Sequence, residues 1–114
     1  MTYCIRADTI LRMYTFLRTP EFDSWLKKLR DPIGKARIIA RIRSAEAGNF
    51  GDCEPVGKGV SEMRIHYGPG YRVYHARDGE TIYLLLCGGN KSTQKKDIQK
   101  AHDLAEKYRG HTDD

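Results

Sequence analysis

Residues 60–89, VSEMRIHYGPGYRVYHARDGETIYLLLCGG, decide the fold class of this chain. Apolar and polar residues alternate along much of the stretch, and two turn signals, GPG at 68–70 and DG at 78–79, divide it into three parts. Alternation with a period of two is typical of a half-buried strand, and Asp-Gly is typical of a hairpin turn. We therefore expect three antiparallel strands, of which the continuously apolar third, Ile82 to Cys87, lies centrally in the sheet.

The GPG turn determines which side chains share a face of this sheet. If GPG forms a three-residue loop around a type II turn, His66 lies opposite Arg72 and Arg64 lies opposite Tyr74. A two-residue loop would place Arg72 among apolar side chains, where burying its charge is costly. The first register is therefore preferred, and it predicts a solvent-facing patch of these four side chains on a rigid sheet.

Helices are expected before and after this strand-rich stretch. Thr19 and Asp31 each precede a proline, which is a start signal for a helix, so two helices should follow each other closely. The β-formers at residues 14–19 predict a strand before the first of them. A last helix, capped by Ser92 or Thr93, is expected after the strand Ile82 to Cys87.

The order of these elements, β-α-α-β-β-β-α, defines an α+β domain whose helices are expected to pack on one face of the sheet. A chain of 114 residues suits a single domain, which we expect at residues 14–109. Residues 1–13 are an N-terminal extension to which the patterns assign no structure. Either Met1 or Met13 could start the native chain. Residues 110–114 form a short tail.

Composition describes a globular protein of moderate positive charge. Hydrophobic residues make up 39% and charged residues 31% of the chain, which is typical of an ordered domain. No apolar run approaches the length of a membrane span and no signal peptide is recognisable, so we expect a cytoplasmic protein with no membrane partner. The net charge of +5 favours polyanionic partners. Three widely spaced cysteines, Cys4, Cys53 and Cys87, predict neither a disulfide framework nor a zinc site.

Residues 84–94, LLLCGGNKSTQ, look like half of a phosphate-binding P-loop. The motif G-x-x-x-x-G-K-[ST], with Lys91 as its lysine, requires glycines where the chain has Leu85 and Asn90, so the nucleotide-binding interpretation fails. The N-terminus of the following helix still offers free N–H groups to a phosphate. If the polyanionic partner is RNA, the residues that we expect to bind it around this terminus are Ser92, Thr93 and Lys95.

The candidate catalytic residues are Arg64, His66, Arg72 and Lys91. A single arginine on a strand is most simply a solvated surface charge, but three cations that converge on a helix N-terminus favour phosphate binding. His66 is the candidate acid or base, because histidine exchanges protons near neutral pH. Tyr74 lies on the same face, where it could stack on an RNA base. No pair of acidic residues has the spacing of a two-metal nuclease, so we expect no metal and no other cofactor.

The second helix carries several cations on one side. Such a side is most simply a solvated face, and the alternative is a docking strip for an acidic partner. The residues of this strip are Lys35, Arg37, Arg41 and Arg43.

Several stretches resemble the addiction-module killer proteins, which are the RelE/HigB-like toxins of bacterial type II toxin–antitoxin systems. These stretches are EFDSWLKKLRD, ARIIARI, GNFGD, VGKGVSEMRIHYGPGYRVYH and LLLCGGNKSTQKKDIQKA, and the similarity runs from about Tyr14 to Tyr108. The resemblance implies a RelE-like fold, in which a small antiparallel sheet packs against an N-terminal helical hairpin. It also implies an mRNA endonuclease, or mRNA interferase, that inhibits translation by cutting on the ribosome. A small antitoxin, expected to be a helix-turn-helix protein from the adjacent gene, would neutralise it.

The resemblance also assigns roles to residues. Arg72 and Lys91 match basic positions that bind and activate the scissile phosphate in relatives, and Arg64 matches less firmly because the hairpin loop here is longer. The lysine that some relatives use as a base has no firm counterpart, since Lys58 is weakly placed. The HigB branch uses histidine and acidic residues near its C-terminus, where this chain differs. His66 is therefore the first candidate for the base.

The leading hypothesis is metal-independent cleavage of ribosome-bound mRNA, in which a 2′-OH attacks the adjacent phosphorus while cations stabilise the developing charge. The alternative is a non-catalytic nucleic-acid-binding or regulatory module on the same fold, because a fold does not fix an activity.

Overall fold

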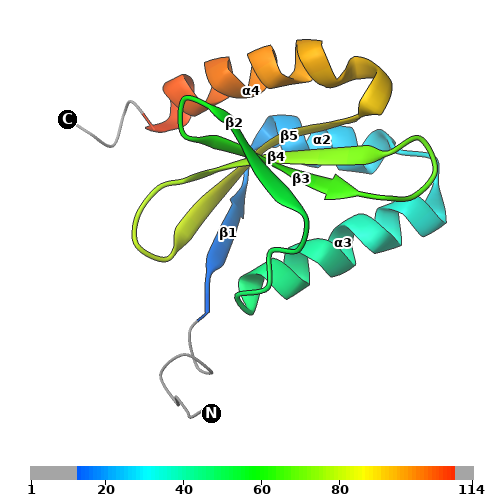
Figure 1. The fold of residues 1–114 in the computed structure, drawn as a ribbon, viewed down its shortest axis with the longest axis horizontal. Helices are drawn as coiled ribbons and strands as arrows, with labels where there is room; N and C mark the ends of the chain where they lie inside the picture. The colour runs from blue at the N-terminus through cyan, green and yellow to red at the C-terminus, as the bar shows by residue number, and fades with distance from the viewer. Residues whose placement is uncertain (1–12, 110–114) are drawn as a thin grey trace.

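A computed structural model describes residues 13–109 and confirms an α+β fold (Figure 1). In chain order the elements are β1 (Thr15–Arg18), α2 (Pro20–Lys28), α3 (Pro32–Glu46), β2 (Cys53–Gly57), β3 (Val60–Ile65), β4 (Tyr71–Arg77), β5 (Ile82–Asn90), the short 3₁₀ turn η1 (Lys91–Thr93) and α4 (Gln94–Arg109). The expectations for the N-terminal extension, apart from Met13, and for the tail lie outside the described residues. None of the described helices is long and apolar enough to cross a membrane.

Five strands form one sheet in the order β1-β5-β4-β3-β2. β1 runs parallel to β5, and the other neighbours are antiparallel. β5 is therefore an inner strand, as its apolar run predicted. β2 is the strand that the sequence patterns missed. Its sequence CEPVG contains Pro55, and a sheet tolerates proline at an edge strand, which is the position of β2.

The helices cover both faces of the sheet, so the expectation of a single covered face is wrong. α2 and α3 pack on one face, where Phe22, Ile38 and Val73 are fully buried, and α4 packs on the other face against Tyr74. Figure 1 shows α3 and α4 on opposite sides of the strands. The reason lies in β4, whose residues 71–76 are all buried. A strand that is buried on both sides needs a layer of helices on each side.

The β3–β4 hairpin has a different register from the expected one. Arg64 lies opposite Arg72, so the pairing is displaced by two residues and the loop comprises residues 66–70. The N–H of Gly70 donates to the carbonyl of Tyr67, which closes a turn over residues 67–70 with Gly68, at a φ of +56°, in its second position. The expected turn, with Pro69 in its second position, begins one residue later. An even displacement leaves every side chain on its predicted face. The assignment to one face therefore holds for the strand residues Arg64, Arg72 and Tyr74, although the pairs were wrong. His66 lies in the loop beyond β3, where it lines a hollow with residues of α3 and Ile65, so its assignment to that face is wrong.

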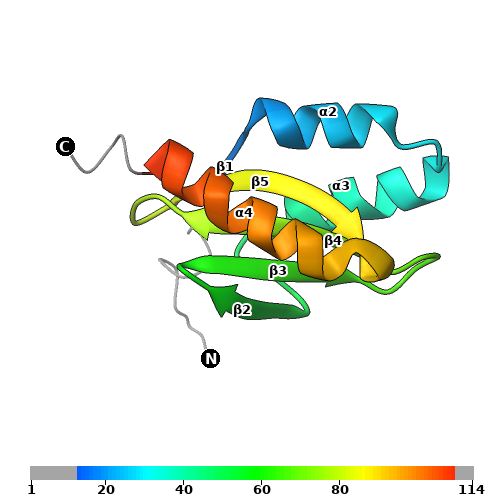
Figure 2. The same ribbon diagram turned by 90° about the horizontal axis from the view of Figure 1, so that it is seen from above.

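Both predicted helix starts are confirmed. The Oγ1 of Thr19 accepts a hydrogen bond from the N–H of Phe22 at 3.1 Å and donates to the carbonyl of Leu85 at 2.8 Å, which ties α2 to the sheet. The carboxylate of Asp31 accepts from the N–H of Gly34 at 3.0 Å. Figure 2 shows the sharp turn at which α2 and α3 meet. These caps produce the helical hairpin that the sequence predicted.

A buried histidine should make the fold sensitive to acid. His75 is 3% exposed and packs against the rings of Phe16, Phe50 and Tyr83, and its burial lowers its pKa from 6.5 to about 4. Below pH 6.5 the unfolded chain binds a proton that the folded chain excludes until about pH 4, so the free energy of unfolding should fall across this window. Since one pKa unit corresponds to about 1.4 kcal/mol, the loss should approach roughly 3 kcal/mol.

The variant His75→Phe fills the same aromatic surroundings without a titrating group. Its free energy of unfolding, measured by urea titration at several pH values, should stay nearly constant between pH 6.5 and 4.5, where the natural chain already loses stability but Glu62 is still ionised. An equal loss in both proteins would assign the acid sensitivity to other groups.

Candidate functional site

One end of the sheet gathers the predicted catalytic residues. β3 ends, β4 begins and β5 ends here, so Arg64 and Arg72 lie opposite each other on neighbouring strands. Beyond this row, the loop carries His66, and Lys91 follows β5; the N–H of Lys91 donates to the carbonyl of Pro69 at 3.4 Å. Two strand spacings of about 4.8 Å separate β3 from β5, so the backbones of His66 and Lys91 lie on the order of 10 Å apart. We call the following residues the sheet-end cluster: Asp52, Arg64, His66, Arg72 and Lys91.

His66 is paired with an aspartate that the sequence analysis missed. Its Nε2 lies 2.6 Å from Oδ2 of Asp52, and the two side chains are 72% and 42% exposed. The hydrogen bond with His66 lowers the pKa of Asp52, which keeps this carboxylate ionised. A carboxylate on one ring nitrogen orients the imidazole and leaves the other nitrogen to accept a proton. The signal that could have found Asp52 is its place in GNFGD, one of the stretches behind the family resemblance.

Arg64 is already paired with two carboxylates. Its Nε lies 3.0 Å from Oε1 of Glu62, and its Nη2 lies 3.1 Å from Oε2 of Glu54. Glu54 belongs to β2, the strand that the sequence patterns missed, and it faces Glu62 across the β2–β3 pair. The charge of Arg64 is therefore balanced within the sheet, and a phosphate would have to share it with these two groups.

Arg72 is buried, so the expectation that it faces solvent is wrong. Arg72 is only 8% exposed, because η1 and α4 cover this face of the sheet. Gly89, its neighbour on β5, packs so closely against Asp97 of α4 that no side chain would fit there. The Nε of Arg72 is buried and has no hydrogen-bond partner within residues 13–109. A buried donor without a partner is costly, and such groups often mark binding or catalytic sites.

Tyr74 is fully buried, so it cannot stack on an RNA base, and that prediction is wrong. Its hydroxyl donates to Oε2 of Glu62 at 2.9 Å, and Nε2 of Gln94 at the start of α4 donates to the same oxygen at 2.8 Å. Burial acts to raise the pKa of Glu62, but hydrogen bonds from Gln94, Arg64 and Tyr74 and the charge of Arg72 outweigh it, and the net pKa is lowered. Glu62 is therefore a buried, ionised centre that holds the two strand arginines and α4 together.

Lys91 lies at the start of a helical segment that a different residue caps. Asn90, not Ser92 or Thr93, is the cap: its Oδ1 accepts from the N–H of Ser92 at 2.9 Å, and its own N–H donates to Oγ1 of Thr93 at 3.2 Å. Lys91 itself is exposed. One surface hollow brings together the predicted RNA-binding residues of this segment and one further lysine, namely Ser92, Thr93, Lys95 and Lys96.

The predicted docking strip on α3 divides into exposed and structural members. Arg37 and Arg43 are exposed, Lys35 is half-buried, and the guanidinium of Arg37 lies 4.7 Å from the ring centre of Tyr67. Arg41 instead points toward the sheet end. Its guanidinium donates to three backbone carbonyls, those of Phe50, Asp52 and Arg64. Arg41 therefore supports the segment that carries Asp52 and is not a free docking residue.

No three histidine, cysteine or acidic side chains gather closely enough to form a metal site in the part of the chain that the structure describes. Of the cysteines, Cys87 is buried and Cys53 is half-buried, and both are free thiols. Cys4 lies outside the described residues.

Comparison with known proteins gives a match to a protein family and a similar protein. The sequence profile of the family described as "Phage derived protein Gp49-like (DUF891)" matches residues 24–109. An uncharacterized protein of Haemophilus influenzae strain Rd is 51% identical over 88 residues, which cover 77% of this chain and 89% of that protein. The matched range contains every residue of the sheet-end cluster.

Proposed function

We propose that this chain, which belongs to the Gp49-like family of phage-derived proteins, is the toxin of a type II toxin–antitoxin pair and an endoribonuclease that cuts ribosome-bound mRNA without a catalytic metal. The family is one of proteins that resemble addiction-module killers, and a toxin of this kind implies an antitoxin partner.

The sheet-end cluster is the observation that carries the proposal. It combines a histidine oriented by a carboxylate, a buried arginine whose Nε lacks a partner, and an exposed lysine next to a cationic hollow. Cleavage of RNA through its own 2′-OH needs a group that takes a proton and cations that stabilise a crowded phosphate, and this cluster holds both.

The proposed roles follow from exposure and charge. The exposed imidazole of His66 takes the proton of the 2′-OH, whose oxygen attacks the adjacent phosphorus. Lys91 lies on the other side of the hairpin tip and binds a phosphate oxygen, and Arg72 stabilises the same negative charge from within the sheet. The bond from phosphorus to the 5′ oxygen then breaks, and that oxygen takes up a proton. The products are a 2′,3′-cyclic phosphate and a 5′-hydroxyl.

The ends of the RNA products test this chemistry. Purified toxin acting on mRNA bound to ribosomes should leave a 2′,3′-cyclic phosphate or the 3′-phosphate that it hydrolyses to. EDTA-treated toxin should remain active once magnesium is restored to the level that keeps ribosomes intact, and calcium or cobalt should add nothing. A 3′-hydroxyl at the cut would contradict attack by the 2′-OH.

A non-catalytic nucleic-acid-binding module is the second candidate, and the pairing of Arg64 favours it. Arg64 is balanced by Glu54 and Glu62, and Arg72 lies beside the same Glu62, so the strand face holds less free positive charge than a phosphate-activating site would use. Under this alternative the chain would bind ribosomes or RNA, and no new RNA ends would appear. The two candidates therefore separate in the same assay.

A further inference from the structure

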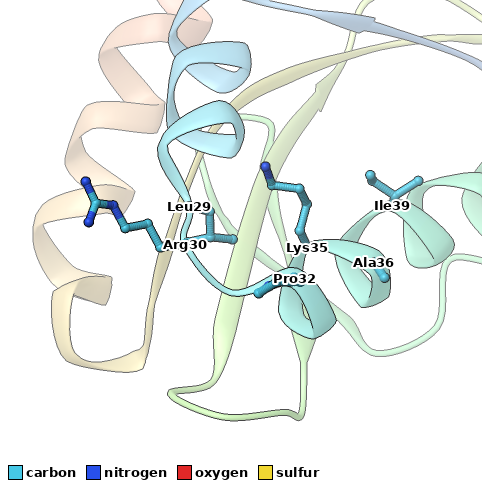
Figure 3. A pocket seen from close by; sticks show the side chains of 6 residues that line it. All are labelled: Leu29, Arg30, Pro32, Lys35, Ala36 and Ile39. Atoms are coloured by element: carbon cyan, nitrogen blue, oxygen red, sulfur yellow. The ribbon is translucent and has the colours of Figure 1, made fainter.

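The angle between α2 and α3 holds a hollow that the proposed cleavage site does not use. Its volume is about 400 Å³. In Figure 3, Lys35 and Ile39 rise from α3 into this angle, Leu29 points into it from the connection, and Arg30 points away on the other side. Leu29 and Ile39 also pack against the core, so the hollow reaches the edge of the core. The lining residues are Leu29, Arg30, Pro32, Lys35, Ala36 and Ile39.

A second hollow continues along α3 toward the sheet-end cluster. Arg37, Ala40 and Arg41 of α3 line it together with Ile65 and the candidate base His66. Its alanine and Ala36 of the first hollow are one helical turn apart, so they lie on the same side of α3. The lining part of α3, residues 32–41, spans about 14 Å at 1.5 Å per residue, which two to three turns of a docked helix would match.

The chemistry of this surface selects its occupant. The first hollow is lined mainly by apolar atoms, and Ile33, next to Pro32 of its lining, is 57% exposed. Residues 27–43 contain seven lysines and arginines but a single acidic residue, Asp31. The carboxylate of Asp31, which accepts hydrogen bonds from Gly34 and Tyr71, offsets only one of these seven charges, so the segment keeps a large excess of positive charge. The surface thus complements a helix with one apolar and one acidic side.

We propose that this surface binds an acidic amphipathic helix of the antitoxin, with an apolar side chain in the α2–α3 hollow and a carboxylate beside Arg37 and His66. The inference rests on the proposed function for the identity of the partner. It adds a mechanism of neutralisation, because a helix that follows α3 into the second hollow covers the exposed imidazole. Single-stranded RNA is a poorer fit for the first hollow, whose lining contains no aromatic ring on which a base could stack.

Two substitutions on α3 that add the same charge provide the test. Ala36→Glu places a carboxylate in the lining of the first hollow, and Ser44→Glu places one on an exposed position of the same helix outside both hollows. The binding partner is the purified product of the reading frame adjacent to the toxin gene. Ala36→Glu should weaken its binding by roughly 30-fold or more, and Ser44→Glu by less than about 3-fold. Ile39→Ala, which enlarges the hollow, should weaken binding without a change of charge.

The possible outcomes separate this inference from the proposed function. RNA cleavage by the free variant Ala36→Glu should equal that of the natural chain, since Ala36 lies outside the sheet-end cluster. Equal weakening by both glutamate variants, or by neither, would overturn the proposed docking surface. Loss of binding to RNA or to anionic phosphatidylserine vesicles, with antitoxin binding intact, would do the same and would identify the other occupant. A natural chain that binds the partner but cuts no RNA would refute the nuclease and leave the docking result standing.

Discussion

Replacing Lys91 with alanine should abolish growth arrest and reduce mRNA cleavage by roughly 100-fold or more, the usual cost of removing one group that stabilises transition-state charge. Lys91 is exposed at the start of η1 and takes part in none of the ion pairs within residues 13–109. The fold should therefore survive, and the variant should still bind its antitoxin. Induction of the toxin in growing cells, followed by colony counts, measures the effect.

Lys58→Ala is the matched control for this substitution. Lys58 lies in the β2–β3 turn, at the opposite end of β3 from His66, and the six residues of β3 separate the two ends by about 20 Å. This distance removes Lys58 from consideration as the catalytic base. The control should remain fully toxic. Full toxicity in a folded Lys91→Ala variant would instead remove Lys91 from the site.

Glu62→Gln should destabilise the fold by about 3 kcal/mol, because it breaks a buried ion pair and leaves two facing arginines without their shared carboxylate. Glu62 is fully buried and accepts hydrogen bonds from Arg64, Tyr74 and Gln94. The free energy of unfolding in urea measures the loss. Glu54→Gln removes the exposed partner of Arg64 and should cost less than about 1 kcal/mol.

The pH dependence of the stability of the natural chain and of Glu62→Gln tests whether the charge of Glu62 causes this loss. The pKa of Glu62 is lowered from its ordinary value of 4.5, so its ionisation stabilises the fold fully above pH 4.5. That contribution is lost as the pH falls through the lowered value. The difference in stability between the natural chain and Glu62→Gln should therefore be constant above pH 4.5 and shrink below it. A difference that does not change in acid would mean that shape, not charge, makes Glu62 necessary.

The fold could be predicted from the sequence wherever a local signal coincided with the final structure. Thr19 and Asp31 cap helices through contacts within three residues, and the alternation in β3 and β4 identified both strands. β2 escaped prediction because Pro55 is an unfavourable strand residue that only an edge position explains. The position of α4 escaped for a different reason. A tyrosine at position 74 fits a wet face as well as a buried one, and only tertiary packing decides between them.

The site was predictable in its residue types but not in its pairings. Parity along the strands placed Arg64 and Arg72 on one face, and that assignment survived an error of two residues in the register. His66, which was assigned to the same face, lies in the loop beyond β3 and lines a hollow beside α3 instead. Asp52 and Glu54 were missed as partners because they come from a different segment, and only the pairing of β2 with β3 brings them to the cations. Glu62 lies two residues from Arg64 on the same strand, but its burial beneath α4 depends on tertiary packing. Arg41 was assigned to a docking strip from its helix face, yet its length lets it reach backbone carbonyls on the neighbouring loop.

The most direct test of the central claim is a map of mRNA ends after brief induction of the natural chain and of Lys91→Ala. The natural chain should create new 5′-hydroxyl ends inside translated reading frames, and co-expression of the antitoxin should remove them. The variant should create none while accumulating to the same level. Growth arrest by the natural chain without new mRNA ends, or identical ends with Lys91→Ala, would contradict cleavage of mRNA at the sheet-end cluster.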